Sequence, residues 1–122
     1  MIKSKFTLTS LLLLVSMASL IADPMGNANY YAPEPVGGIE SLERNTVYPL
    51  FEKTDGNEAD VVIRFTVDSR GNVSNVSVAQ SGGSLFDNSA IMAVENTDWI
   101  PAMQNGFRVR VTYELPFKYR TQ

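Results

Sequence analysis

The chain contains no cysteine and no histidine among its 122 residues. The absence of cysteine excludes a disulfide framework, a thiol nucleophile, a cysteine zinc site and the lipid-modified amino terminus of bacterial lipoproteins. The absence of histidine excludes a Ser-His triad and an imidazole metal site. Nothing else in the sequence predicts a metal site or a cofactor. Asp60 and Asp68 are too far apart on one predicted strand to act as an acid–base pair, so we expect no enzymatic activity.

The first 22 residues have the pattern of a secretory signal peptide. Lys3 and Lys5 precede an apolar run from Phe6 to Ala22, and residues 16–18 and Ala22 offer small residues for cleavage. The alternative is an uncleaved membrane anchor, because this run of about 17 residues is at the lower limit for a membrane span. In both cases we expect the remainder in the periplasm, with membrane contact only through residues 6–22 if they are retained.

Charge is unevenly distributed after residue 22. Residues 23–122 carry 8 basic and 13 acidic residues, a net charge of −5. Four of the basic residues lie in the last 16 positions, where Glu114 is the single acid. An acidic total on an exported chain argues against nucleic-acid binding. The basic carboxy-terminal stretch could steer an acidic partner, or it could only keep an exposed strand soluble.

The remaining sequence predicts one small α+β domain. Residues 23–35 are rich in Pro, Asn and Ala and are interpreted as a flexible arm, and the domain itself is expected over residues 36–120. Apolar periodicity and turn residues predict, in order, a short helix at 39–45, a helical turn near 50–55, strands at 59–68 and 73–80, a helix capped by Ser84 and a strand at 107–117. This order predicts a three-stranded antiparallel sheet with two helices packed on one face.

The last strand is predicted from the sequence "FRVRVTYELPF". Alternate residues are apolar, beginning at Phe107 and ending at Phe117, so one face of this strand should be buried. In the preceding strand, the parity of the apolar residues slips between Val73 and Val76, which predicts either a bulge near the hairpin turn or a late start to regular pairing. The aromatic residues expected in the core are Trp99, Phe65, Phe86, Phe107, Tyr113 and Phe117.

Several short motifs together resemble the carboxy-terminal domain of the energy-transducing protein TonB. They are Tyr48-Pro49, the hairpin turn from Asp68 to Gly71, Trp99-x-Pro101-Ala102, Asn105-Gly106 and Leu115-Pro116-Phe117, and the resemblance runs in order from about Glu34 to Tyr119. It implies a periplasmic domain that binds a short extended segment, the TonB box, of outer-membrane receptors by strand addition at the edge of the last strand. Carried over to this sequence, the partner-binding residues are Val47, Tyr48 and Pro49 and the backbone of Arg108, Val109, Arg110, Val111, Thr112, Tyr113 and Glu114.

Members of this family resemble one another in having an uncleaved inner-membrane helix and a long proline-rich spacer, whereas this sequence has a short arm. A second hypothesis therefore stays open. The same strand edge could pair with its own copy in a homodimer, or the domain could be a structural envelope protein that is not coupled to transport. In the first hypothesis the partner is a TonB-dependent outer-membrane receptor or another envelope protein.

Overall fold

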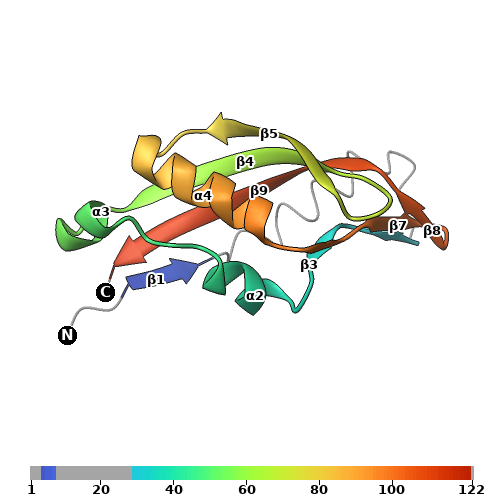
Figure 1. The fold of residues 1–122 in the computed structure, drawn as a ribbon, viewed down its shortest axis with the longest axis horizontal. Helices are drawn as coiled ribbons and strands as arrows, with labels where there is room; N and C mark the ends of the chain where they lie inside the picture. Colours follow the sequence, from blue (N-terminus) through green and yellow to red (C-terminus); the bar gives the residue numbers. More distant parts are fainter. Residues whose placement is uncertain (1–3, 8–28, 122) are drawn as a thin grey trace.

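The computed structural model describes residues 4–7 and 29–121 and has the α+β architecture predicted from the sequence (Figure 1). Its main sheet is antiparallel and, within these residues, contains four strands in the order β1-β9-β4-β5. Their bounds are β1 (Ser4–Thr7), β9 (Val111–Thr121), β4 (Ala59–Val67) and β5 (Val73–Gln80). The three long strands are the expected ones. The fourth, β1, was not expected, because it lies in the predicted leader.

In the described part of the chain, three helices accompany the sheet: α2 (Ile39–Arg44), α3 (Leu50–Thr54) and α4 (Ser84–Asn96). The longest, α4, packs against β4 and β5, and α2 packs against α4, so both cover one face of the sheet (Figure 1). The short α3 buries none of its side chains. Within the described residues, no helix has the length and hydropathy needed to cross a membrane.

Two smaller sheets lie at the end of the molecule away from α3 (Figure 1). One contains β2 (Tyr30–Tyr31), β7 (Ala102–Gln104) and β8 (Phe107–Val109), and the other pairs β3 (Glu34–Pro35) with β6 (Trp99–Ile100). The second half of the expected arm, residues 29–35, therefore contributes strands to the domain. Residues 23–28 of the arm, and residues 1–3 and 8–22 of the expected leader, lie outside the described residues.

The expected strand 107–117 is divided into β8 and β9 at Arg110. Asn105 and Gly106 have φ angles of 51° and 83°, so they form the two-residue turn of a tight hairpin in which Gln104 stands opposite Phe107. This hairpin directs β8 back along β7 and out of the main sheet. Phe107 was expected in the core, but its side chain is 74% exposed, so that prediction is wrong.

The predicted bulge lies in β5. The register with β4 changes between the pairs Arg64–Ser77 and Thr66–Ser74, which leaves one additional residue in β5. Asn75, inside this interval, has a φ angle of 53°. Because of the bulge, Val73 and Val76 can both pack against the core although they are three residues apart.

The start of α4 differs from the expected cap at Ser84. Gly83 is the N-cap residue, with a φ angle of 108°, and the helix begins at Ser84. The carboxylate of Asp87 reaches back and accepts hydrogen bonds from the Gly82 N–H at 2.8 Å and from the Ser81 hydroxyl at 2.5 Å. No side chain caps the first turn, so the predicted Ser84 cap is wrong; Asp87 instead ties the start of the helix to the preceding loop, and its charge suits the positive end of the helix dipole.

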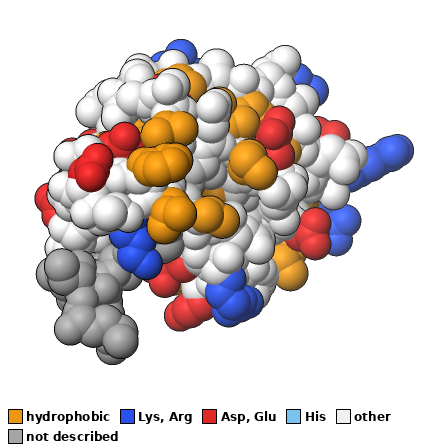
Figure 2. Space-filling view, turned by 60° about the vertical axis from the view of Figure 1, so that its left-hand side comes forward, with side chains coloured by type: hydrophobic (Ala, Val, Ile, Leu, Met, Phe, Trp, Pro, Cys, Tyr) orange, Lys and Arg blue, Asp and Glu red, His pale blue; other side chains and the backbone are white. Residues whose placement is uncertain are grey.

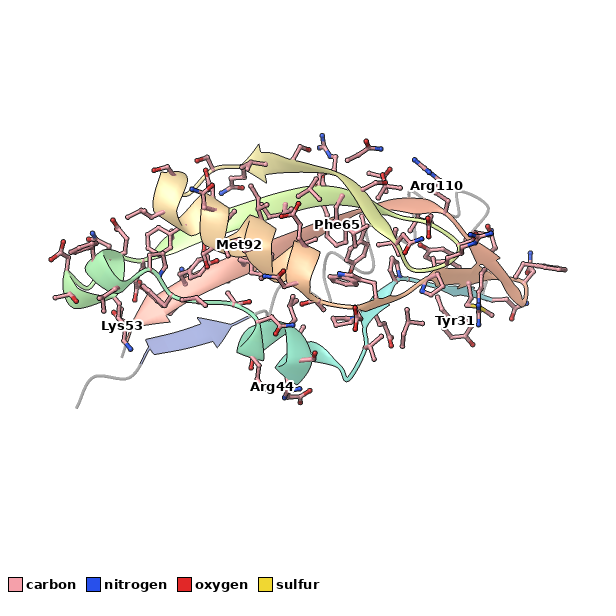
Figure 3. The ribbon with its side chains drawn as sticks, viewed as in Figure 1. Tyr31, Arg44, Lys53, Phe65, Met92 and Arg110 are labelled. Atoms are coloured by element: carbon pink, nitrogen blue, oxygen red, sulfur yellow. The ribbon has the colours of Figure 1, made fainter. Side chains whose placement is uncertain are left out.

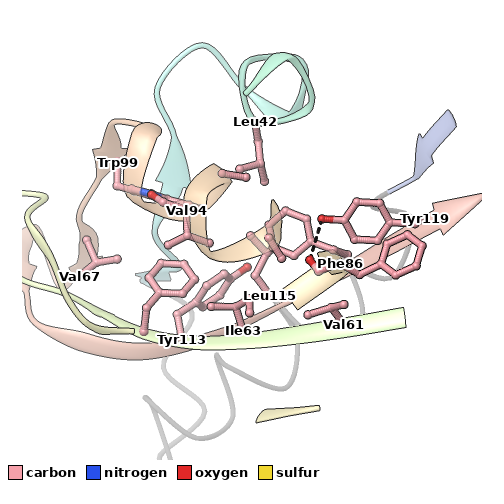
Figure 4. Packing of buried hydrophobic residues seen from close by; sticks show 14 of the residues in the cluster. Leu42, Val61, Ile63, Val67, Phe86, Val94, Trp99, Tyr113, Leu115 and Tyr119 are labelled. Carbon is pink, nitrogen blue, oxygen red and sulfur yellow. Dashed lines mark hydrogen bonds between the residues drawn. The ribbon is translucent and has the colours of Figure 1, made fainter. Parts of the chain in front are cut away.

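The core lies between the sheet and the α2–α4 layer (Figure 4). Phe65 on β4 contacts Trp99 and Tyr113, with ring centroids 5.0 and 5.9 Å away. The indole N–H of Trp99 donates to the Val94 carbonyl at 3.1 Å, so this buried ring leaves no polar atom unsatisfied. The prediction that Trp99 is a core residue is confirmed.

Candidate functional site

The candidate site is the edge of β9 that faces away from β4. On its inner side, β9 pairs with β4 in continuous register from Val111 opposite Val67 to Tyr119 opposite Ala59. In an antiparallel strand the N–H and C=O of one residue point to the same side, and successive residues alternate between the two sides. The side to which each residue points decides which backbone groups a partner could reach.

Two observations fix this alternation. Pro116 has no N–H, so a place in an inner strand requires its nitrogen to face away from the ladder with β4. The N–H of Thr121 donates to Glu58, the residue before β4, at 2.9 Å, so the odd-numbered residue 121 points inward. The even-numbered residues of β9 therefore direct their backbone groups to the outer edge.

The outer edge has two parts, separated by Pro116. In the first part, Thr112 and Glu114 direct N–H and C=O groups outward, and none of the strands within residues 4–7 and 29–121 pairs with them there. In the second part, β1 pairs with Lys118 to Thr121. Pro116 contributes only a carbonyl between them.

Cross-strand polar pairs occupy the sheet face opposite α4. The Arg64 guanidinium bonds the Glu114 carboxylate, the hydroxyls of Thr66 and Thr112 are 3.3 Å apart, and Arg120 forms an ion pair with Asp60 at 2.6 Å. These pairs hold β9 against β4. Glu114 and Asp60 also neutralise part of the positive charge of the basic carboxy-terminal stretch. A uniform basic surface along β9, considered in the sequence analysis, is therefore absent on this face of the described strands.

The Val47-Tyr48-Pro49 segment adjoins the carboxy-terminal end of β9. The buried Tyr48 ring meets the rings of Phe86 and Tyr119 edge-on, with centroids 5.7 and 5.6 Å away. Its hydroxyl donates to the Asn57 carbonyl, and burial, followed by the nearby Glu58 charge, raises its pKa. Tyr48 therefore positions the segment, and its side chain is not open to a partner.

A hydrogen-bonded relay links this segment to β9. The Tyr119 hydroxyl donates to Ser89 Oγ at 2.9 Å, and the Ser89 hydroxyl donates to the Val47 carbonyl. Tyr119 also reaches the Phe86 carbonyl at 3.4 Å (Figure 4). Ser89 was missed in the sequence analysis because a single serine in an amphipathic helix gives no signal of such a contact.

Exposed apolar side chains surround the relay. Val47, Leu50 and Phe51 are between 71% and 75% exposed, although all are large and hydrophobic. Leu85 and Met92, seven residues apart on one side of α4, are also exposed, and Ser89 lies between them on that helix. Figure 2, in which the α3 end of Figure 1 comes forward, shows hydrophobic side chains gathered on this face. This patch was not predicted, because its residues come from three separate segments and form no periodic pattern in the sequence.

The structure does not bring the predicted site residues together at one point. Arg110 lies toward the β7–β8 end and Lys53 of α3 at the opposite end (Figure 3). From Val111 to Tyr119 the strand advances about 26 Å, at roughly 3.3 Å per residue. Val47, Tyr48 and Pro49 adjoin the Tyr119 end, whereas Arg108 to Glu114 lie at the other. Arg108 and Val109 pair with β7 and are outside the main sheet.

The buried Tyr119 hydroxyl gives a pH-dependent prediction. Desolvation raises its pKa to about 12, although the bond to Ser89 lowers it. Because the folded state holds the proton more tightly than the unfolded chain, stability should be intact below pH 10 and should fall between about pH 10 and 12. Tyr119→Phe should reduce this alkaline loss by about 2 kcal/mol, at 1.4 kcal/mol per unit of pKa, in urea titrations across that range. Tyr31→Phe, at an exposed position, is the control and should leave the loss unchanged.

Comparison with known proteins identifies the fold and the family. The profile of the Gram-negative bacterial TonB protein C-terminal family matches residues 44–121. The solution structure of the Pseudomonas aeruginosa TonB carboxy-terminal domain is similar at 22% identity with a TM-score of 0.55, over 79% of this chain and 90% of that one. The Helicobacter pylori TonB carboxy-terminal domain (residues 179–285) is similar at 18% identity with a TM-score of 0.52, over 67% of this chain and 75% of that one. The comparison with curated proteins finds no match. On the family match and the shared fold, this chain belongs to the TonB C-terminal family, a non-catalytic family of TonB-dependent transport in the Gram-negative envelope.

Proposed function

We propose that this domain binds an extended segment of an outer-membrane TonB-dependent receptor, in the periplasm, as an additional strand on the outer edge of β9. The observation that carries the proposal is the outward direction of the Thr112 and Glu114 backbone groups, beside a stretch of the same edge that already accepts a strand. An edge strand with unpaired groups is the site at which strand addition takes place in many peptide-binding domains.

The backbone groups alone would support only weak binding. Five outward groups, from Thr112, Glu114 and the Pro116 carbonyl, at about 1 kcal/mol of net stabilisation each, correspond to a dissociation constant of roughly 0.2 mM at best. Side-chain contacts must add to this. The exposed apolar residues near Val47 adjoin the far end of the edge, so a segment of about nine residues could pair along β9 and also reach them.

The experiment replaces one outward N–H. Thr112→Pro removes a donor from the outer edge and places a ring in the path of a guest strand, at a position with the same orientation as the native Pro116. We expect peptides of about ten residues, taken from the periplasmic amino-terminal segments of TonB-dependent receptors, to bind this variant at least tenfold more weakly. Isothermal titration calorimetry on the full chain measures the change.

Thr112→Val is the matched control, because it keeps the N–H and removes only the hydroxyl that faces Thr66. Its peptide affinity should stay within twofold of the original. Equal affinity in all three proteins would exclude strand addition at this edge. Light scattering on the same samples addresses the homodimer: a dimer that Thr112→Pro converts to a monomer, together with no peptide binding, would favour the structural alternative.

A further inference from the structure

We propose that β1 is an internal competitor of the partner segment: it occupies the Lys118–Thr121 end of the outer edge of β9 and keeps that end closed until it is displaced or removed. This inference rests on the proposed function and concerns the regulation of the same site. It would make peptide binding depend on whether the amino-terminal segment is still attached and in place.

The register of β1 supports the competition. Ser4 stands opposite Thr121 and Thr7 opposite Lys118, in an antiparallel pair. The outward groups at this end belong to Lys118 and Arg120, so β1 uses the same hydrogen-bonding groups that a guest strand would need there. A guest and β1 cannot both pair with them.

The end that β1 covers is also the end beside the Val47–Pro49 segment. Tyr119 lies within the paired stretch, opposite Phe6, and its ring contacts Tyr48. A partner confined to the open part would pair with Thr112 and Glu114 without reaching this end. A partner that spans both parts must displace β1.

The closure is weak enough to be reversible. The pairing covers only the four residues of β1, and a longer β1 would reach Pro116, which offers no donor for a continuing ladder. Its place in the same chain compensates for this shortness, because β1 competes intramolecularly with a guest that must come from solution. The apparent affinity for a guest strand equals the intrinsic affinity multiplied by the fraction of molecules in which β1 is detached. If β1 is paired in nine-tenths of the molecules, the guest binds about tenfold more weakly.

The sequence indicates how the closure would end. Residues 1–22 have the pattern of a secretory signal peptide, and β1 lies within them. Cleavage after the leader would remove β1 together with it. The precursor would then be the closed form, and the processed domain would present the outer edge from Thr112 to Arg120 without this competitor.

The test uses the full chain and two proline variants. In this register the backbone N–H and C=O groups of Lys5 and Thr7 point toward β9, whereas those of Phe6 point away from it. Thr7→Pro should therefore break the pairing, and Phe6→Pro is a control that leaves the facing groups in place. We expect Thr7→Pro to bind the receptor peptides at least threefold more tightly than the original chain, and Phe6→Pro to stay within twofold.

Amide hydrogen exchange supplies a second measurement that does not depend on the peptide. The Lys118 and Arg120 amides should exchange slowly in the original chain and in Phe6→Pro, and at least tenfold faster in Thr7→Pro. If all three proteins bind the peptide with the same measurable affinity, β1 does not compete with the partner, and the proposed function is unaffected. Absence of peptide binding in every protein overturns the proposed function, and the competition with it.

Discussion

Replacing Phe65 by alanine should lower the free energy of unfolding by about 3–5 kcal/mol, the usual cost of removing a buried phenylalanine ring. Phe65 is fully buried in the carboxy-terminal half of β4 and contacts the rings of Trp99 and Tyr113. The neighbouring aromatic rings are themselves held by the sheet and by the Trp99 bond to Val94, so they cannot collapse fully into the vacated volume. Small domains have a total stability of about 5–15 kcal/mol, so this single change should bring the domain close to unfolding.

Phe107→Ala is the matched control for this prediction. It removes the same ring from a side chain that is 74% exposed at the β7–β8 hairpin, and it should change stability by no more than about 0.5 kcal/mol. Urea titration followed by the fluorescence of the single tryptophan measures both variants. Similar losses for the two would contradict the placement of Phe107 outside the core.

Replacing Gly71 by alanine should destabilise the domain by about 2–5 kcal/mol, through backbone strain and overpacking together. Gly71 has a φ angle of 86°, and an added Cβ would lie 2.3 Å from the Trp99 carbonyl oxygen. The turn cannot move away easily, because the Asp68 carboxylate accepts bonds from the Arg70 and Asn72 N–H groups at 2.9 and 2.8 Å. The same bonds lower the pKa of Asp68.

Gly56→Ala is the control that separates backbone strain from overpacking. Gly56 also has a positive φ angle, 72°, but an added Cβ there would meet no atom within 4 Å. This variant should lose only the backbone contribution, about 1–2 kcal/mol. Thermal unfolding of both variants measures the difference, and equal losses would show that the contact with Trp99 imposes no cost of its own.

The fold was predictable wherever a local pattern decides the structure. The alternation of Val61, Ile63, Phe65 and Val67 has the period of a half-buried strand, and these four side chains are fully buried in β4. The slip in the apolar parity of β5 predicted a bulge or a late start to regular pairing, and the structure has the bulge, which turns two valines three residues apart to the same face.

Phe107 shows where local pattern is insufficient. Its alternation with Val109 and Val111 is that of a buried strand, but the Asn105-Gly106 turn pairs Phe107 with Gln104 outside the main sheet. Burial depends on which strand becomes the neighbour, and strand pairing is a tertiary property. The contribution of β1 was unpredictable for the same reason, since four residues at the start of a leader carry no signal of pairing with residues more than 100 positions away.

Part of the geometry around the candidate site was predictable from the sequence, whereas the binding role of its residues stays a prediction. The last long strand does present an outer edge, and Tyr48 does lie beside its end. The distance between the predicted partner-binding segments Val47–Pro49 and Arg108–Glu114 could not be derived from the sequence, because the direction and length of β9 decide how far apart they lie. The role of Ser89 depends on the meeting of α4 with the Val47 carbonyl, and no spacing in the sequence encodes that contact.

Pro116 also has a consequence for the behaviour of the domain in concentrated solution. An unpaired strand edge is a template on which identical molecules can stack and precipitate. A proline in the middle of such an edge, with charged side chains at Glu114 and Lys118 on either side, interrupts any long ladder between copies. The domain can thus leave an edge open for a short extended segment while limiting its own aggregation.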